Sequence, residues 1–222
     1  MPRKSIKVSR KAGAKLQLFW QTTNFLAFFY CLKARINEKK RTFASDMNKL
    51  TRLFVWLSRF KYRLGFGIQS PNDYYFVRNV VLEKWPYYKY QELDKTVDDW
   101  LARKLGHLYF RLANWRQPNI IVDDELSPYW KAGCKRSIVT NEQQPADIIR
   151  IHLSTLTQQE ISDIISNAKE KTILVIEDIC KNKQLWQDII QNLKATVTYD
   201  LYYCGLVMFD KQHSKKNYII NF

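Results

Sequence analysis

The chain has 222 residues, enough for one sizeable domain or for one domain with an extension. Apolar residues make up 46% of it and aromatic residues 14%, which excludes a mainly disordered chain. Its 36 basic and 21 acidic side chains give a net charge of +15, which is unevenly spread. Residues 1–63 hold 16 basic and 2 acidic side chains, a net of +14, so a nearly neutral body follows a strongly basic segment.

The first 46 residues read as a basic N-terminal extension. A basic start followed by the apolar run 25–32 has the order of a signal peptide. The polar stretch 21–24 interrupts the apolar residues, however, and no small-residue cleavage site follows. The run is also far shorter than the roughly 18 apolar residues of a spanning helix. We therefore expect a protein that is neither secreted nor membrane-spanning, although a helix at a membrane surface stays open.

Residues 47–222 read as one domain with a helical part, 47–117, and a sheet part, 118–222. In the helical part, apolar residues recur at steps of three and four from 48 to 64 and from 94 to 115, which predicts two helices. Between them, Ser70 and Pro71 begin a third helix, because serine is a good cap and proline suits the first helical position.

In the sheet part the apolar period shortens to that of strands. Strands are predicted at 119–122, 137–140, 147–151, 172–176, 196–199, 206–209 and 218–222. Thr157 and Glu160 form a capping-box pattern that begins a helix, and residues 182–193 predict another. Such alternation predicts an α/β fold: a Rossmann-like, mostly parallel sheet with helices on both faces. The loop 210–216 predicts a C-terminal antiparallel hairpin of the last two strands at one edge.

Three stretches carry a resemblance to a known family. These are residues 61–71 (KYRLGFGIQSP), residues 174–179 (LVIEDI) with a tryptophan seven residues later, and residues 196–209 (TVTYDLYYCGLVMF). They resemble the HSPF-type segment, the strand-five segment and the closing strands of bacterial class I S-adenosylmethionine-dependent methyltransferase-like proteins. The resemblance implies a seven-stranded methyltransferase sheet that begins at Met47, with residues 1–46 as an addition.

The chain departs from that family where the cofactor would bind. Such enzymes follow the first strand with a glycine-rich turn, because only glycine lets the backbone approach the cofactor closely. Here residues 123–132 contain no glycine, and Pro128 and Trp130 add bulk. In the HSPF-type segment, Gln69 and Asn72 replace the histidine and the phenylalanine. We therefore expect a degenerate member with no cofactor, and S-adenosylmethionine only if the site is retained.

Acidic residues follow two predicted strands, at the edge where open α/β sheets bind ligands. Asp123, Asp124 and Glu177 are the candidates for cofactor binding, and Asp178 is a candidate catalytic residue. His152 ends another strand and is a second catalytic candidate. The simpler alternative is that these acids cap the helices that follow them and that the histidine is structural.

Other reactive groups give no motif. The four cysteines form no CxxC pair, and reduced thiols in a cytoplasmic protein fit a domain of this size. Cys180 follows Asp178 closely, without a cation that would activate it, and reads as inert. The three histidines have no paired spacing, so no metal site is expected.

The basic segment has three interpretations. Clusters of lysine and arginine in residues 1–63 attract polyanions without sequence specificity. Trp20 and Phe25 could stack on bases or insert at lipid headgroups. Nucleic acid, an anionic membrane surface and a merely solvated extension all remain open.

The sequence therefore predicts a methyltransferase-like domain that acts as a binding or interaction module after loss of its cofactor site. One alternative is an active S-adenosylmethionine-dependent methyltransferase with an atypical site. The other is a protein that binds RNA, DNA or anionic lipid through its basic N-terminus.

Overall fold

The computed structural model describes residues 44–125, 127–142, 144–210 and 214–222. The chain divides into two compact units, Met1–Val55 and Trp56–Phe222. All but the last three residues of the predicted extension 1–46 lie outside the described residues. Helix α2 (Ala44–Ser58) begins four residues before the predicted helix 48–64 and ends six residues before its end.

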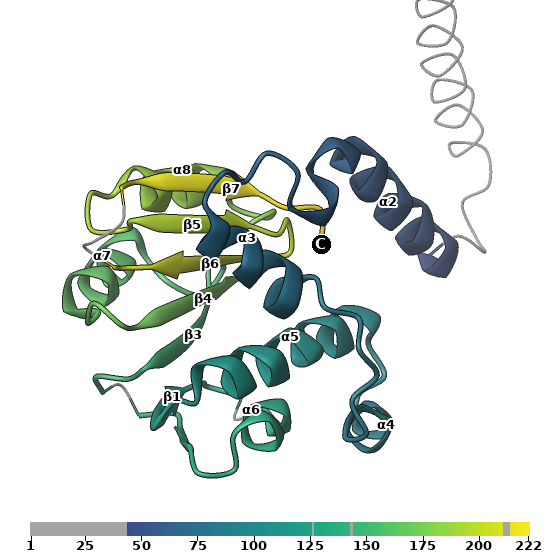
Figure 1. Cartoon of the computed structure of the whole chain (residues 1–222), viewed down its shortest axis with the longest axis horizontal. Coiled ribbons are helices and arrows are strands. Elements are labelled where there is room, and N and C mark those ends of the chain that lie inside the picture. Colours follow the sequence, from purple (N-terminus) through teal and green to yellow (C-terminus); the bar gives the residue numbers. More distant parts are fainter. Residues whose placement is uncertain (1–43, 126, 143, 211–213) are drawn as a thin grey trace, which may run out of the picture. The chain divides into compact units, whose positions relative to one another are not determined.

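The second unit contains a seven-stranded sheet of order β2-β1-β3-β4-β6-β5-β7. Figure 1 shows β4, β6, β5 and β7 side by side. Its strands are β1 (Ile120–Val122), β2 (Ile138–Thr140), β3 (Ile148–His152), β4 (Ile173–Glu177), β5 (Val197–Asp200), β6 (Cys204–Met208) and β7 (Lys216–Ile219). Strands β2, β1, β3 and β4 run parallel to their neighbours. The prediction of an α/β fold with a mostly parallel sheet is confirmed.

The antiparallel pair lies inside the sheet rather than at its edge. Strand β6 is antiparallel to both β4 and β5, whereas β7 is parallel to β5 and forms the edge. The predicted hairpin of 206–209 with 218–222 is therefore wrong in its partners. The hairpin is made by β5 and β6, whose connection closes with a hydrogen bond from Leu201 N to Cys204 O and has Tyr202 at φ +73°.

Helices cover both faces of this sheet. Before β1 come η1 (Phe60–Gly65), α3 (Pro71–Phe76), η2 (Val77–Val81), α4 (Tyr90–Leu93), η3 (Asp94–Thr96) and α5 (Trp100–Arg116), and between or after the strands come α6 (Pro128–Gly133), α7 (Gln158–Asn167) and α8 (Lys183–Gln191). Helix α3 has the predicted Ser70 cap, which accepts from Asp73 N, and α7 has the predicted capping box. Helix α5 begins six residues later than predicted, because Val97 is extended and the Asp99 carboxylate caps Ala102 N.

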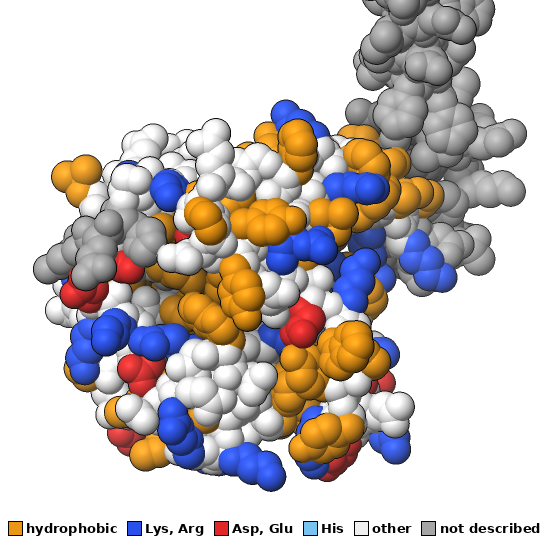
Figure 2. Space-filling model, in the orientation of Figure 1, with side chains coloured by type: hydrophobic (Ala, Val, Ile, Leu, Met, Phe, Trp, Pro, Cys, Tyr) orange, Lys and Arg blue, Asp and Glu red, His pale blue; other side chains and the backbone are white. Residues whose placement is uncertain are grey.

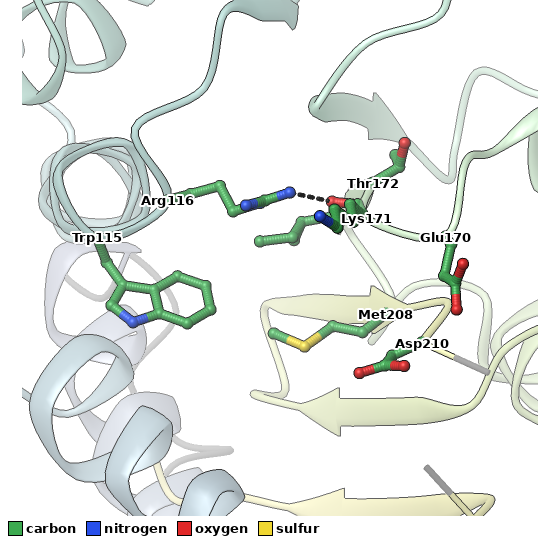
Figure 3. Close-up of a pocket in the computed structure, with 8 residues that line it drawn as sticks. Trp115, Arg116, Glu170, Lys171, Thr172, Met208 and Asp210 are labelled. Atoms are coloured by element: carbon green, nitrogen blue, oxygen red, sulfur yellow. Dashed lines mark hydrogen bonds between the residues drawn. The ribbon is translucent and has the colours of Figure 1, made fainter. Parts of the chain in front are cut away.

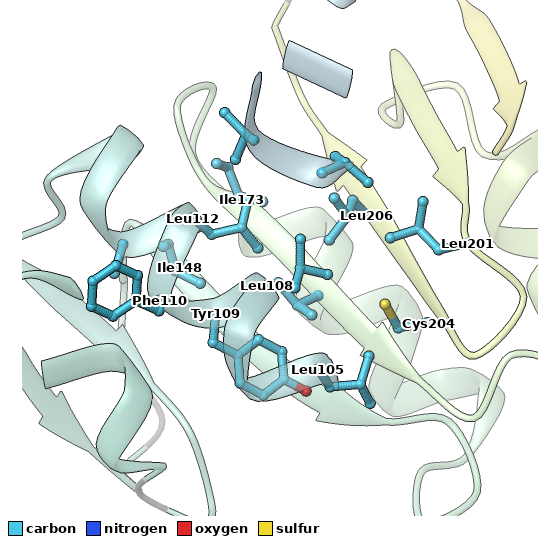
Figure 4. Close-up of a cluster of buried hydrophobic side chains, with 14 of the residues drawn as sticks. Leu105, Leu108, Tyr109, Phe110, Leu112, Ile148, Ile173, Leu201, Cys204 and Leu206 are labelled. Atoms are coloured by element: carbon cyan, nitrogen blue, oxygen red, sulfur yellow. The ribbon is translucent and has the colours of Figure 1, made fainter. Parts of the chain in front are cut away.

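The two faces bury separate clusters of apolar side chains. In β4, Ile173 and Val175 point into the cluster under α5, whereas Leu174 and Ile176 point into the cluster under α7 and α8. Figure 4 shows the α5 side, where Leu108 and Leu112 lie over the strands. Both leucines are fully buried, and each such side chain contributes about 1.5–3 kcal/mol to folding.

One crossover lacks a helix. Helix α6 joins β1 to β2, and α7 joins β3 to β4, but the described residues between β2 and β3 include no helical residue. A hollow of about 510 Å³ lies beside α7, over β1 and β3, with Val122 and Ile149 among its lining residues. The sheet is therefore incompletely covered on this face.

Within the described part of the chain, no helix has the length and apolar character needed to cross a membrane.

Candidate functional site

The carboxyl ends of β1, β3 and β4 bring the predicted acidic residues to one edge. Strand β1 ends one residue before Asp123, β3 ends at His152 and β4 ends at Glu177. His152 and Glu177 are direct partners across the β3–β4 pair. Because the three strands are parallel, side chains at their ends converge, as expected for the ligand-binding edge of an open α/β sheet.

Arg150 stands at the centre of this edge. Its guanidinium lies 2.6 Å from Asp123 Oδ1, 2.8 Å from Glu125 Oε2 and 2.5 Å from Glu177 Oε1. The arginine side chain is only 5% exposed. We call the set of Arg150, Asp123, Glu125, Glu177 and Tyr109 the Arg150 cluster, because the tyrosine hydroxyl also donates to Glu177.

Asp123 has no capacity left for a ligand. Its Oδ1 accepts Glu125 N at 3.1 Å and Arg150 Nη1 at 2.6 Å, and its Oδ2 accepts Ser127 N at 2.9 Å and Trp130 Nε1 at 2.8 Å. A carboxylate offers about four lone-pair positions, and these four hydrogen bonds use them. Asp123 is also 0% exposed. Asp123 therefore holds the following turn and the Trp130 side chain, whereas α6 itself begins after Ser127 without a side-chain cap.

Glu177 is buried beside excess negative charge. Burial, with a smaller effect of the nearby Asp178 carboxylate, raises the pKa of Glu177 to about 8, although Lys181 opposes this shift. The hydrogen bond from Arg150 favours the charged form, but that one cation is shared with Asp123 and Glu125. The pKa of Glu177 is therefore raised, since one guanidinium cannot neutralise three carboxylates.

His152 lies next to the Arg150 cluster. Its Nδ1 is 3.7 Å from Glu177 Oε2, and its Nε2 is 3.3 Å from Glu125 Oε1. Nε2 is buried and has no hydrogen bond of good geometry. His152 also lines the hollow beside α7, together with the exposed Asp124. Of the predicted residues, Asp123, Glu177 and His152 are brought together, whereas Asp124 is not among the carboxylates paired with Arg150.

Asp178, the other catalytic candidate, is held by residues near it. Its backbone is left-handed, with φ +63°, and its carboxylate lies 2.9 Å from Lys181 Nζ and accepts from Ser154 Oγ at 3.2 Å. Burial and Asp178 raise the pKa of the Cys180 thiol, as expected for an inert cysteine. Neither residue takes part in the Arg150 cluster.

Aromatic side chains fill the space next to Asp123. Trp130 in α6 is completely buried and stacks on Tyr109 of α5, with ring centroids 4.5 Å apart and planes 15° apart. Helix α6 was not predicted, and it occupies the place where the family resemblance implies a glycine-rich turn. Asp123, the candidate cofactor ligand after the first strand, is therefore bonded within the chain, and the space beside it is filled by Trp130.

Arg150, Tyr109 and Trp130 are the residues that the sequence reasoning missed. Arg150 gave a signal, since it interrupts an otherwise apolar strand, and a charged residue is almost never fully buried without a partner. Its partners follow β1 and end β4, so three strands had to be placed before the cluster could be recognised. Tyr109 and Trp130 gave no signal, because both read as core residues of helices.

A further hollow lies at the opposite edge of the sheet. It measures about 400 Å³, and Figure 3 shows Trp115 of α5 facing Met208 of β6 across it. Arg116 donates to the carbonyl of Lys171 at 2.9 Å beside it. None of the predicted site residues lines this hollow.

Among the residues that the structure describes, no group of three or more histidine, cysteine or acidic side chains is arranged to hold a metal ion. Comparison of the chain with known proteins gave no match to a family model, to a curated protein or to a solved structure.

Proposed function

We propose that this chain is a binding module built on a methyltransferase-like α/β domain whose cofactor edge is closed by the Arg150 cluster. The seven-stranded, mostly parallel sheet supports the first half of this proposal, because the family resemblance implies such a sheet. The second half depends on one observation: Asp123 has all its hydrogen-bonding positions filled from within the chain.

Opening this edge to a cofactor would be costly. A ligand that replaced Arg150 would leave the wholly buried Asp123 carboxylate without its cation. Breaking a buried ion pair in this way costs about 3–5 kcal/mol. A ligand hydroxyl group supplies much less, since a hydrogen bond to a charged group contributes about 1.5–3 kcal/mol.

Calorimetric titration with S-adenosylmethionine tests the closed edge. We expect no binding heat and no rise in melting temperature at ligand concentrations up to about 1 mM, a concentration at which a micromolar ligand would stabilise the fold by about 4 kcal/mol. S-Adenosylhomocysteine serves as a second ligand in the same experiment. A micromolar dissociation constant for either would overturn the proposal and support the alternative, an active methyltransferase with an atypical site.

Polyanion binding through the basic N-terminus is a second candidate, favoured by the net charge of +14 in residues 1–63. Residues 1–43 lie outside the described part of the chain. Retention of RNA by the full chain and by a protein that begins at Met47, compared across a salt series, tests this candidate. Equal retention that does not depend on salt would exclude it.

A further inference from the structure

The η1–α3 segment forms a hollow with an unusual lining. The hollow measures about 530 Å³, lies wholly within the second unit and is built from one continuous stretch of chain. Its lining residues are Phe60, Lys61, Arg63, Leu64, Gly65, Phe66, Gly67, Ile68 and Tyr74. We call it the Phe66 hollow. It lies in a different part of the domain from the Arg150 cluster.

The charge of the Phe66 hollow is entirely positive. Lys61 and Arg63 are its charged lining residues, and neither forms an ion pair with any carboxylate of the described chain. Instead, Lys61 Nζ lies 4.8 Å from the centre of the Tyr62 ring, and the Arg63 guanidinium lies 4.6 Å from that of Phe60. Two cations without anionic partners, placed beside rings, are the arrangement expected where a protein holds a phosphate next to a base.

Asp73, the acidic residue of this segment, binds side chains of the sheet. Asp73 is buried and accepts hydrogen bonds from the hydroxyl groups of Tyr199 and Tyr218, and Lys216 lies 3.5 Å from it. Its negative charge is therefore directed into the sheet and away from the hollow. An anion that enters the Phe66 hollow meets no carboxylate among its lining residues.

Aromatic rings of the Phe66 hollow lie open to solvent. Phe66 is 78% exposed, and Phe60 and Tyr74 are each close to half exposed. Exposed large rings gathered in one place are uncommon on a protein without a partner there. Figure 2 shows apolar and basic side chains side by side on the face that carries α3.

The loop that carries Phe66 is preformed. Leu64, Gly65 and Gly67 have φ values of +60°, +77° and +91°, and hydrogen bonds from Phe66 N to Arg63 O and from Ile68 N to Gly65 O close it. A Cβ atom on Gly65 would lie 3.3 Å from the Tyr74 ring, so this glycine allows the close packing of loop and ring. A loop backbone closed in this way loses little conformational entropy when a ligand binds.

We infer that the Phe66 hollow binds single-stranded nucleic acid, with an unpaired base stacked on Phe66 and its phosphates paired with Lys61 and Arg63. This inference rests on the proposed binding function and deepens it by naming the ligand class and the site. The exposed rings offer flat faces on which an unpaired base can stack, and the two cations beside them suit the phosphates of the same strand. Lys61 and Arg63 supply the phosphate contacts without base preference.

Binding of a fluorescent single-stranded oligouridylate of about 12 nucleotides, measured by anisotropy on the full chain, tests the inference. The measurement is made in about 0.3 M salt, because this concentration weakens purely ionic binding by the N-terminal segment. Phe66→Leu keeps an apolar side chain but removes the flat ring. We expect it to weaken binding at least about fivefold, whereas Phe66→Trp binds within about twofold of the unmodified chain. Tyr88→Ala, which removes an exposed ring outside the hollow, leaves binding unchanged.

The double variant Lys61→Ala/Arg63→Ala tests the phosphate contacts. It lowers the slope of log affinity against log salt by about 1.4, because each phosphate contact on a single strand contributes about 0.7. Lys135→Ala/Arg136→Ala, an exposed pair outside the hollow, keeps the slope. Full oligouridylate binding by Phe66→Leu would overturn the inference. Binding to anionic lipid vesicles is measured on the same variant. Loss of vesicle binding with retained oligouridylate binding would show that the hollow binds a membrane surface instead. The S-adenosylmethionine titration is a separate measurement, so a failure here is distinguishable from a failure of the closed edge.

Discussion

At the scale of single residues, the Arg150 cluster decides what the carboxyl edge of the sheet can do. Arg150 lies among the side chains that would face a ligand at such an edge, and it forms ion pairs with Asp123, Glu125 and Glu177. Buried ion pairs of this kind contribute little net stability compared with apolar packing, but removing one partner is costly. Substitutions in the cluster therefore report on folding more directly than on ligand binding.

Arg150→Met keeps most of the apolar stem and removes the charge. It leaves the buried Asp123 without its cation, so the free energy of unfolding falls by about 3–5 kcal/mol, as measured by urea denaturation. Arg136→Met is the matched control, because Arg136 is exposed and makes a single hydrogen bond to the carbonyl of Gln117. We expect that control to change stability by no more than about 0.5 kcal/mol. Equal effects of both substitutions would contradict the role assigned to the cluster.

Glu177→Gln separates burial from charge. Burial raises the pKa of Glu177 from its ordinary value of 4.5 to about 8, so the native state keeps a proton that the unfolded chain releases. The stability that this group contributes is full below pH 4.5 and is lost as the pH rises to about 8, with a slope of at most about 1.4 kcal/mol per pH unit. Glutamine stays neutral throughout, so unfolding free energies measured from pH 5 to 8 become less dependent on pH. An unchanged dependence in the variant would show that the carboxylate is already charged in the native state.

At the scale of elements, close contacts between helices and strands depend on small residues. Gly205 in β6 lies under Trp186 of α8, and a Cβ atom there would come within 2.4 Å of the indole ring. Gly205 therefore permits α8 to pack closely on the sheet. The same helix face buries Leu185 and Ile189.

Gly205→Ala forces the indole or the strand to move, and overpacking of this kind costs about 1–3 kcal/mol. Trp186→Leu removes the ring that meets the new methyl group. In a double-mutant cycle we expect the two substitutions together to cost less than the sum of the single costs, by at least about 0.5 kcal/mol. Additive costs in the denaturation data would mean that the ring and the glycine do not meet.

The capping box of α7 gives a smaller effect. Thr157 Oγ1 accepts from Glu160 N, and the Glu160 carboxylate accepts from Thr157 N at 2.7 Å. Thr157→Ala leaves Glu160 N without its side-chain acceptor and lowers the unfolding free energy by about 1 kcal/mol. Thr155→Ala, outside the helix, changes it by less than about 0.5 kcal/mol. The reverse order of the two variants would contradict the assignment.

Local sequence patterns predicted where helices and strands lie better than they predicted which strands pair with each other. The Ser70 cap, the capping box and the first six apolar runs depend on neighbours in sequence, and each lies where it was predicted to within two residues. The last strand begins two residues before the predicted 218–222 and ends three residues before its end. The insertion of β6 between β4 and β5 depends on partners far away, and no local pattern distinguishes it from an edge hairpin. The late start of α5 follows from the extended Val97 and from Asp99 as the cap, whereas the Asp94 carboxylate binds Tyr129 and His107.

The same distinction applies to the candidate site. Acids after strands predicted which edge of the sheet to inspect, and Asp123, Glu177 and His152 do meet there. That they meet around an arginine could not be predicted without knowing that β3 lies between β1 and β4. The Phe66 hollow was missed because its loop was interpreted as an altered family segment and Lys61 and Arg63 only as part of the basic segment 1–63.

At the scale of the whole domain, the sheet has a protected centre and weak margins. All five residues of β4 are buried, whereas β2 is short and Ile138 in it is exposed. Amide hydrogen exchange should therefore be slowest in β4 and in β6, its antiparallel neighbour, and fastest among the strands in β2. Mass spectrometry of exchanged peptides measures this order. Slow exchange in β2 together with fast exchange in β4 would contradict the strand order described above.

The connection between β2 and β3 is where this chain can best accept additional residues. Glu142 and Gln144 are exposed, and the hydrogen bonds that hold the start of β3 begin only at Ala146 and Asp147. Doubling the length of such a surface loop costs only about 0.6 kcal/mol in closure entropy. Residues 141–145 are therefore the place where a tag, a reporter or a whole inserted helix can be accommodated without disturbing the strands on either side.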